Sequence, residues 1–132
     1  MAKDQERGAL VLVLADDEEI RDGIEALLET DGYRISTARN IEDAAHSATR
    51  KTPDLILVTL AQPPYSIVES AAQVRTLAGL SERVPIIIFC CPTIRQGAEL
   101  RVEKNIYLTR PDNFDQLRRL LSRLLSGTVT QQ

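Results

Sequence analysis

Short apolar runs alternate along the chain with segments in which apolar residues recur every three or four positions. Continuous apolar runs of this length are typical of strands that are covered on both faces of a sheet. The pattern predicts five strands, at 9–15, 33–37, 55–60, 84–91 and 105–109. Helical spacing between and after these runs predicts that each strand is followed by a helix, with the weakest helical pattern before the last strand.

Local signals indicate where the helices begin and end. Asn40 and Asp112 carry side-chain oxygens that suit the N-caps of the second and last helices. Glycine favours the left-handed conformation that follows many helices. Gly32, Gly79 and Gly127 are therefore expected to end the first, third and last helices, which leaves the residues after Gly127 as a frayed tail.

Strands that alternate with helices form a parallel sheet with helices on both faces. Right-handed crossovers then predict an α/β fold with a doubly wound, five-stranded parallel sheet in the flavodoxin-like order 2-1-3-4-5. In such a sheet, ligands bind outside the carboxyl ends of the strands. We therefore expect one pocket lined by residues at or just after these ends: Asp16, Asp17, Thr59, Cys90 and Arg110.

The composition narrows the class of protein. The 132 residues, 43% of them hydrophobic, fit a single domain with a core over about 9–125 and with 126–132 as a tail or the start of a linker. A net charge of -3 gives no basic surface for nucleic acid or for an anionic membrane. No apolar run reaches the roughly 18 residues that span a bilayer, and the N-terminus lacks a signal-peptide pattern, so we expect a cytoplasmic protein.

Four motifs, in this order, resemble the CheY-like receiver domain of bacterial response regulators: VLADDEE, PDLILVTL, VPIIIFCC and YLTRP. The resemblance covers about Ala9 to Leu125, nearly the whole chain. Receiver domains accept a phosphoryl group from a histidine kinase onto an aspartate, beside a divalent metal that acidic residues hold. The resemblance implies that Asp16 and Asp17 are the metal-holding pair and that Thr59 occupies the phosphoacceptor position.

The same resemblance implies switch-equivalent positions at Cys90, Tyr107 and Arg110, where the family has a hydroxyl residue, an aromatic residue and a lysine. Pro111 matches the proline that follows a cis peptide bond in the family. The stretch 92–105 is shorter than the family pattern, so the fourth helix is expected to be short or irregular.

Three of the five pocket positions therefore depart from the receiver pattern, and each departure disfavours phosphoryl transfer. The hydroxyl of Thr59 is un-ionised, needs a base, and removes one carboxylate from the oxygen ligands that magnesium requires. Cysteine at 90 is a weak hydrogen-bond donor, and the planar fork of Arg110 favours a fixed carboxylate partner over a mobile contact. The sequence predicts no catalytic residue, no enzymatic activity, and no cofactor beyond weak magnesium at Asp16 and Asp17.

The leading hypothesis is a pseudo-receiver in two-component phosphorelay signalling, which binds a protein partner without aspartyl phosphorylation. The expected partner is a histidine kinase, an output domain or another regulator, bound through the 92–125 face, and a homodimer is one arrangement. Alternatives are a receiver switched by another modification and a redox switch on Cys90, where a cation favours the thiolate. A flavin or nucleotide site is disfavoured because the acidic segment ADDEE follows the first strand and repels phosphate.

Ordinary structural roles are also open for the pocket residues. Asp16 and Asp17 can cap the first helix and stabilise its dipole, and Thr59 suits a strand because it is β-branched. Two neighbouring anions also favour a cation close by, and Arg110, at the end of the last strand, is the expected counter-ion.

Overall fold

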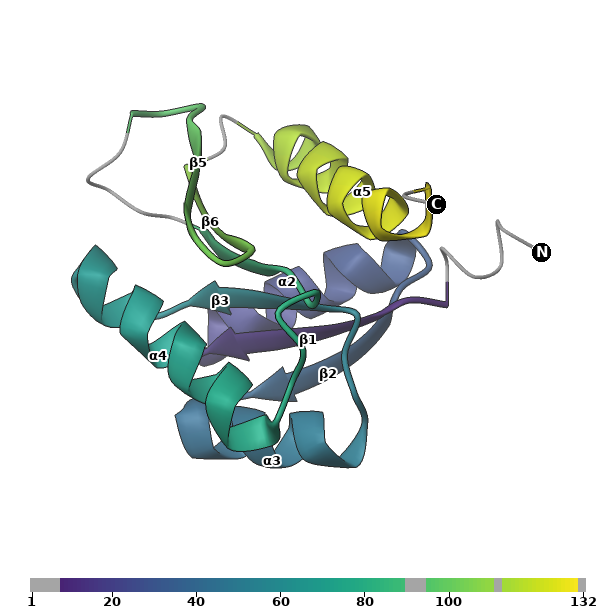
Figure 1. The fold of residues 1–132 in the computed structure, drawn as a ribbon. Helices are drawn as coiled ribbons and strands as arrows, with labels where there is room; N and C mark the ends of the chain where they lie inside the picture. Colours follow the sequence, from purple (N-terminus) through teal and green to yellow (C-terminus); the bar gives the residue numbers. More distant parts are fainter. Residues whose placement is uncertain (1–7, 90–94, 111–112, 131–132) are drawn as a thin grey trace.

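In the part of the chain that the structure describes, a sheet of six strands runs through the molecule, and two helices cover each of its faces (Figure 1). The computed structural model describes residues 8–89, 95–110 and 113–130. The strands are β1 (Leu10–Ala15), β2 (Arg34–Ala38), β3 (Leu55–Thr59), β4 (Ile86–Phe89), β5 (Glu99–Glu103) and β6 (Ile106–Thr109). The helices are α2 (Glu18–Thr30), α3 (Ile41–Arg50), α4 (Pro64–Ala78) and α5 (Phe114–Thr130).

The strand order is β2-β1-β3-β4-β6-β5, and the first five strands of this order are parallel. The doubly wound sheet expected from the sequence is therefore confirmed, with β6 as its fifth parallel strand. The register places Ala15 beside Thr59 and Phe89 beside Thr109. The carboxyl ends of these strands thus lie along one edge of the sheet, which is where the sequence predicts the pocket.

The sixth strand corrects the expectation of a helix before the last parallel strand. Within the described residues 95–110, β5 pairs antiparallel with β6, and no helix forms. The backbone of Gly97 has a φ of 86° and that of Asn105 a φ of 61°, which are conformations that glycine and asparagine tolerate best. Between them the segment ELRVE alternates polar and apolar residues with the period of a strand, so a hairpin forms in place of a helical turn.

Side chains from α4 and from the hairpin turn hold the hairpin against the sheet. Arg75 of α4 is 8% exposed, and its guanidinium donates hydrogen bonds of 2.7 Å to the carbonyls of Lys104 and Val84. The side chain of Asn105 donates to the carbonyls of Glu82 and Arg83, at 3.1 and 3.0 Å. The turn between β5 and β6 is therefore tied to the segment that leads into β4.

The core lies in two layers, one on each face of the sheet. α3 and α4 pack on one face, against side chains that include Leu12, Leu14, Ile56, Val58, Ile86 and Ile88. α2 and α5 pack on the other face, against side chains that include Val11, Val13, Leu55, Leu57 and Ile87. Because successive residues of a strand point to opposite faces, apolar strands that are covered on both faces supply both layers.

Most of the predicted helix ends are confirmed. Gly32 and Gly79 adopt positive φ values of 94° and 66° after the first and third predicted helices, and the side chain of Asn40 caps α3. Asp112 lies outside the described residues, so its role as a cap stays a prediction, and the side chain of Asn113 accepts a 3.0 Å hydrogen bond from the N–H of Gln116. The expectation that Gly127 ends the last helix is wrong. Helix α5 continues through Gly127 to Thr130, since a glycine inside a helix costs only about 1 kcal/mol relative to alanine.

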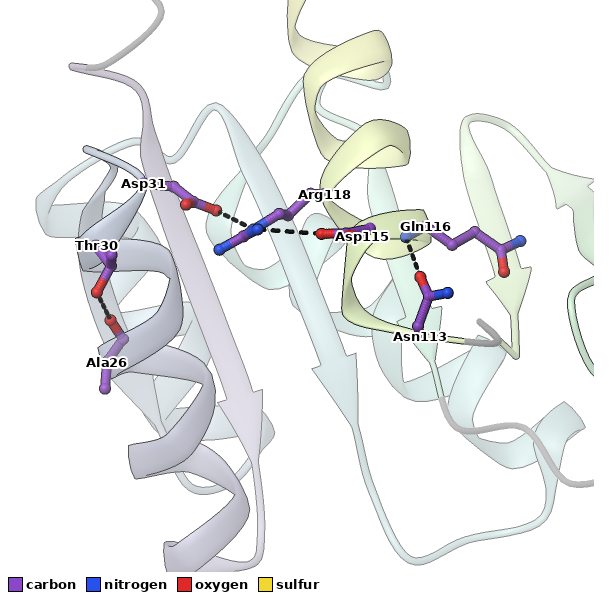
Figure 2. A network of polar contacts seen from close by, with 7 residues as sticks. All are labelled: Ala26, Thr30, Asp31, Asn113, Asp115, Gln116 and Arg118. Carbon is purple, nitrogen blue, oxygen red and sulfur yellow. Dashed lines mark hydrogen bonds and ion pairs between the residues drawn. The ribbon is translucent and has the colours of Figure 1, made fainter.

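An arginine links the two helices that share one face of the sheet. Arg118 of α5 donates to the carboxylate of Asp31 at 2.9 Å, and to that of Asp115 at 3.1 Å (Figure 2). Asp31 is the C-cap residue that directly follows α2, so the contact joins the end of α2 to the first turns of α5. The Arg118 guanidinium also lies 5.1 Å from the centre of the Phe114 ring, a distance that favours a cation–π contact.

Candidate functional site at the strand ends

The acidic pair and Thr59 come together at the carboxyl ends of β1 and β3. Thr59 is the last residue of β3 and is 9% exposed, while Asp16 and Asp17 follow β1 and are exposed. Thr59 pairs with Ala15, the residue that precedes Asp16. Thr59 therefore lies next to the acidic segment at the end of the two strands. The structure therefore brings together three of the five positions that the sequence assigned to the pocket.

Each aspartate also has a structural role. Asp17 is the N-cap of α2, and its carboxylate accepts a 3.0 Å hydrogen bond from the N–H of Ile20. A carboxylate at this position is favoured by the positive end of the helix dipole. Asp16 accepts a hydrogen bond from the N–H of Ala61 at 3.1 Å, which connects the loop after β1 to the loop after β3.

One residue at this edge was not predicted from the sequence. Arg21, in the first turns of α2, donates a 2.9 Å hydrogen bond to the carbonyl of Ala15 at the end of β1. The N–H of Arg21 also donates to the carbonyl of Asp17. Its position four residues after Asp17 is the signal that could have found it, because residues four apart share one side of a helix. A guanidinium therefore lies at the strand end that carries the acidic pair.

Arg110 does not take the role expected of it. It directly follows β6 and is exposed, and its backbone bonds to Ala98 and Gly97 on the hairpin side of the sheet. None of the ion pairs formed among described residues joins Arg110 to Asp16 or Asp17. The predicted contact between Arg110 and the acidic pair is therefore not formed.

Of the remaining switch-equivalent positions, the structure describes Tyr107. Tyr107 lies in β6, half-buried, between Ile87 of β4 and Arg101 of β5 in the sheet register. Cys90 and Pro111 lie outside the described residues. Their roles therefore stay predictions.

The oxygen ligands at the strand ends are few for a metal. Magnesium sites combine carboxylates with other oxygen ligands in a near-octahedral arrangement. Among the residues that the structure describes, no group of three or more His, Cys, Asp or Glu side chains is placed to hold a metal ion. Asp16 and Asp17 follow β1 at this edge, and position 59 at the end of β3 holds a threonine, which adds no carboxylate.

Two solved receiver domains have the same fold. The receiver domain of the sensor histidine kinase PA1611 from Pseudomonas aeruginosa, which has magnesium in its active-site cleft, is 28% identical with a TM-score of 0.68. That match covers 90% of this chain and 98% of that one. The response regulator TrrA from Thermotoga maritima, solved with Mg²⁺ and BeF, is 25% identical with a TM-score of 0.67, over 88% of this chain and 98% of TrrA. The chain belongs to the CheY-like receiver family of response regulators.

A relative of similar size is known from sequence. A 14.6 kDa protein from the sodA1 3′ region of Leptolyngbya boryana is 31% identical over 113 residues, which are 84% of this chain and 86% of that one. No established family profile matches this receiver. None of its described helices has both the length and the apolar character that crossing a bilayer requires.

Asp16, Asp17 and Thr59 lie where the resemblance to receiver domains placed them along the chain. The acidic pair of this receiver follows β1, as the sequence resemblance implied, and Thr59 ends β3 beside it. Asp16, Asp17 and Thr59 therefore lie at one edge of the sheet, and their assignment to a receiver pocket stays a prediction.

Proposed function

We propose that this receiver is a pseudo-receiver: a cytoplasmic interaction module of two-component signalling that works without aspartyl phosphorylation and without enzymatic activity. The observation that supports this proposal is the place of Thr59, at the end of β3 beside the acidic segment. A carboxylate at this place is ionised at neutral pH and can attack phosphorus, whereas a hydroxyl needs a base.

The hydrogen bonds of the acidic pair support the same proposal. Asp16 and Asp17 each accept a backbone hydrogen bond within the fold, from Ala61 and Ile20. These bonds use part of the acceptor capacity of each carboxylate. We expect magnesium to bind weakly here, and calorimetry that gave a dissociation constant well below about 1 mM would contradict this.

The proposed partner surface is the 92–125 face, of which the structure describes residues 95–110 and 113–125. A hollow of about 530 Å³ lies between the hairpin and α5, lined by Gly97, Glu99, Gln116, Arg119 and Arg123. Gln116 donates to the carbonyl of Gly97 at 2.8 Å, and Arg123 pairs with Glu99 at 2.9 Å, so α5 and β5 are held as one surface. A fixed surface with both signs of charge suits recognition of a protein partner.

TrrA has been solved in complex with the histidine kinase ThkA. We propose that this chain likewise acts through a protein partner, which is a histidine kinase, an output domain or another regulator. No nucleic-acid or membrane role is proposed, because the net charge is -3.

The deciding experiment is incubation with acetyl phosphate and magnesium, followed by intact-mass measurement, with a receiver that has the phosphoacceptor aspartate as positive control. We expect no increase of about 80 Da, the mass of one phosphoryl group, on this chain. An adduct that is present on the wild-type chain and absent from Thr59→Ala would overturn the proposal.

A further inference from the structure

Among the described residues, one edge of strand β5 pairs with no other strand. The strand lies at the end of the sheet, and in the part of the chain that the structure describes its one neighbouring strand is β6. Figure 1 shows the β5–β6 hairpin at the outer end of the molecule, beside α5. Two large apolar side chains of this strand, Leu100 and Val102, are 46% and 41% exposed. An edge strand with exposed apolar residues can pair with a strand from another chain.

The side chains of β5 are sorted between the two faces of the sheet. Leu100 pairs with Leu108, which belongs to the core layer under α3 and α4, so Leu100 lies on that face. Glu99 and Arg101 lie on the opposite face, where Glu99 contacts Arg123 and Gln116 of α5. A strand added to the free edge would meet the apolar side chain of Leu100 on one face of the sheet. On the other face it would meet a charged row, which consists of Glu99 and Arg101.

The charged row is complementary to itself. We propose that β5 pairs antiparallel with β5 of a second copy of this chain, about a two-fold axis at Leu100. This register places Leu100 opposite Leu100 of the partner subunit. It also places Glu99 opposite the partner's Arg101, and Arg101 opposite the partner's Glu99. Two opposite-charge cross-strand pairs and one apolar pair then form at the centre.

Neighbouring registers are less favourable. Pairing centred on Arg101 would place this arginine opposite the arginine of the second copy, and like charges directly opposite each other destabilise a strand pair. The register between β5 and β6 also shifts between Arg101 and Glu103, which makes the end of β5 irregular. The regular part of the edge is thus the part that contains Glu99, Leu100 and Arg101.

The partner groups are available for this pairing. Arg101 is exposed and takes part in none of the ion pairs formed among the described residues. The carboxylate of Glu99 accepts from Arg123 and Gln116, and a carboxylate has room for further donors. The opposite edge of the sheet, β2, has the sequence RISTA and offers no such pair of opposite charges.

The pairing extends the proposed function, because it names a second copy of this chain as one partner of the 92–125 face, and it needs no phosphoryl group. Charges along an edge strand normally prevent pairing between chains. In this strand they select one register and one partner, since the same pattern read antiparallel matches itself.

Sedimentation equilibrium over a concentration series tests the pairing, with no phosphodonor present. We expect the wild-type chain to dimerise. Arg101→Glu should weaken the dimer about tenfold or more, because both central pairs become glutamate opposite glutamate. Glu99→Arg should weaken it similarly, by placing arginine opposite arginine. An equimolar mixture of the two variants should associate again, since every central pair in the mixed dimer has opposite charges.

A cysteine placed on the two-fold axis tests the register. In a chain whose native cysteines are replaced by serine, Leu100→Cys should form a disulfide-linked dimer under mild oxidation, because directly opposed residues lie within bonding reach. Leu77→Cys is the matched control, since Leu77 of α4 is 55% exposed and lies off the edge. It should stay monomeric under the same conditions.

A wild-type chain that remains monomeric at about 1 mM, the weak end of specific association, would overturn the proposal. A dimer that is insensitive to Arg101→Glu and gives no Leu100→Cys crosslink would also overturn it, because that dimer would use another surface. Circular dichroism of each variant confirms the fold. The sedimentation and crosslinking results are independent of the acetyl phosphate test, so failure of the pairing is distinguishable from failure of the proposed function.

Discussion

The carboxylate of Asp16 accepts a hydrogen bond of 3.1 Å from the backbone N–H of Ala61, a residue 45 positions further along the chain. This bond joins the loops that follow β1 and β3, just beyond the Ala15–Thr59 pair that ends the two strands. Asp16 thus contributes to the position of the loop after Thr59 within the fold itself. An acidic residue at this edge is therefore explained in part by structure.

Asp16→Ala should lower the free energy of unfolding by about 0.5–1.5 kcal/mol, because the N–H of Ala61 loses its partner. Asp16→Asn retains a side-chain oxygen and should lie closer to the wild-type chain. Urea denaturation of the three proteins measures the difference. Equal stability of the alanine and wild-type chains would show that the contact contributes nothing.

Thr59→Asp should destabilise the chain by about 2 kcal/mol, since it places a third carboxylate, largely buried, beside Asp16 and Asp17. Magnesium should offset part of this loss in the variant, because binding to the folded state raises stability by mass action. The wild-type chain should respond little to magnesium. Thermal denaturation with and without magnesium measures both effects.

The control is Thr59→Val, which keeps the β-branched shape without adding charge and should not gain a magnesium response. A wild-type chain stabilised by magnesium as strongly as Thr59→Asp would contradict the weak-metal expectation. We expect the aspartate to restore little phosphorylation by acetyl phosphate, because Cys90 and Arg110 also depart from the family pattern.

Arg75→Met should be among the most destabilising substitutions outside the apolar core. The methionine fills much of the space but leaves the carbonyls of Lys104 and Val84 without the donors that now lie 2.7 Å away. Each lost partner of a buried polar group costs about 1–3 kcal/mol, so we expect a loss of about 2–4 kcal/mol in urea denaturation.

Arg83→Met provides the matched control for Arg75→Met, because Arg83 is exposed and lies in the segment that leads into β4. It should change the stability by less than about 0.5 kcal/mol. If the two variants are equally stable, Arg75 does not hold the hairpin. Amide hydrogen exchange at β5 and β6 should also accelerate in Arg75→Met, since the turn between them loses its anchor.

Arg118→Ala should cost about 1 kcal/mol, because this arginine joins Asp31 to Asp115 and covers Phe114 (Figure 2). The side chain is 42% exposed, so the loss should shrink as salt concentration rises. Arg119→Ala, one position along the same helix and exposed, is the control and should be nearly neutral. A double-mutant cycle with Asp31→Ala isolates the pair, and zero coupling would contradict the link.

The parallel part of the fold was predictable because each of its signals is local. The apolar runs that became β1, β3 and β4 are covered on both faces, and such strands are recognisable without knowing what covers them. The caps at Asn40, Gly32 and Gly79 depend on a side-chain oxygen or on a left-handed backbone within a few residues. Parallel topology then followed from the strand–helix alternation, and with it the edge that carries Asp16, Asp17 and Thr59.

The hairpin carried a sequence signal too, but the resemblance to receivers pointed to a helix at this place. The segment ELRVE alternates like a strand, and Asn105 suits a turn with positive φ. A short segment of this kind is marginal by itself, since a two-stranded hairpin in water is barely stable. It is held here by Arg75 of α4 and by Gln116 of α5, which contact it from elements distant in the chain.

Tertiary structure alone decided which partners the charged side chains take. The sequence placed Arg110 near the acidic pair, because the ends of parallel strands share one edge, but a long side chain on an exposed loop can point in several directions. The carboxylates found nearer partners in the N–H groups of Ala61 and Ile20. Residue type and spacing therefore determined the fold and the location of the site, whereas the contacts within it depend on the three-dimensional positions of loops that no local pattern specifies.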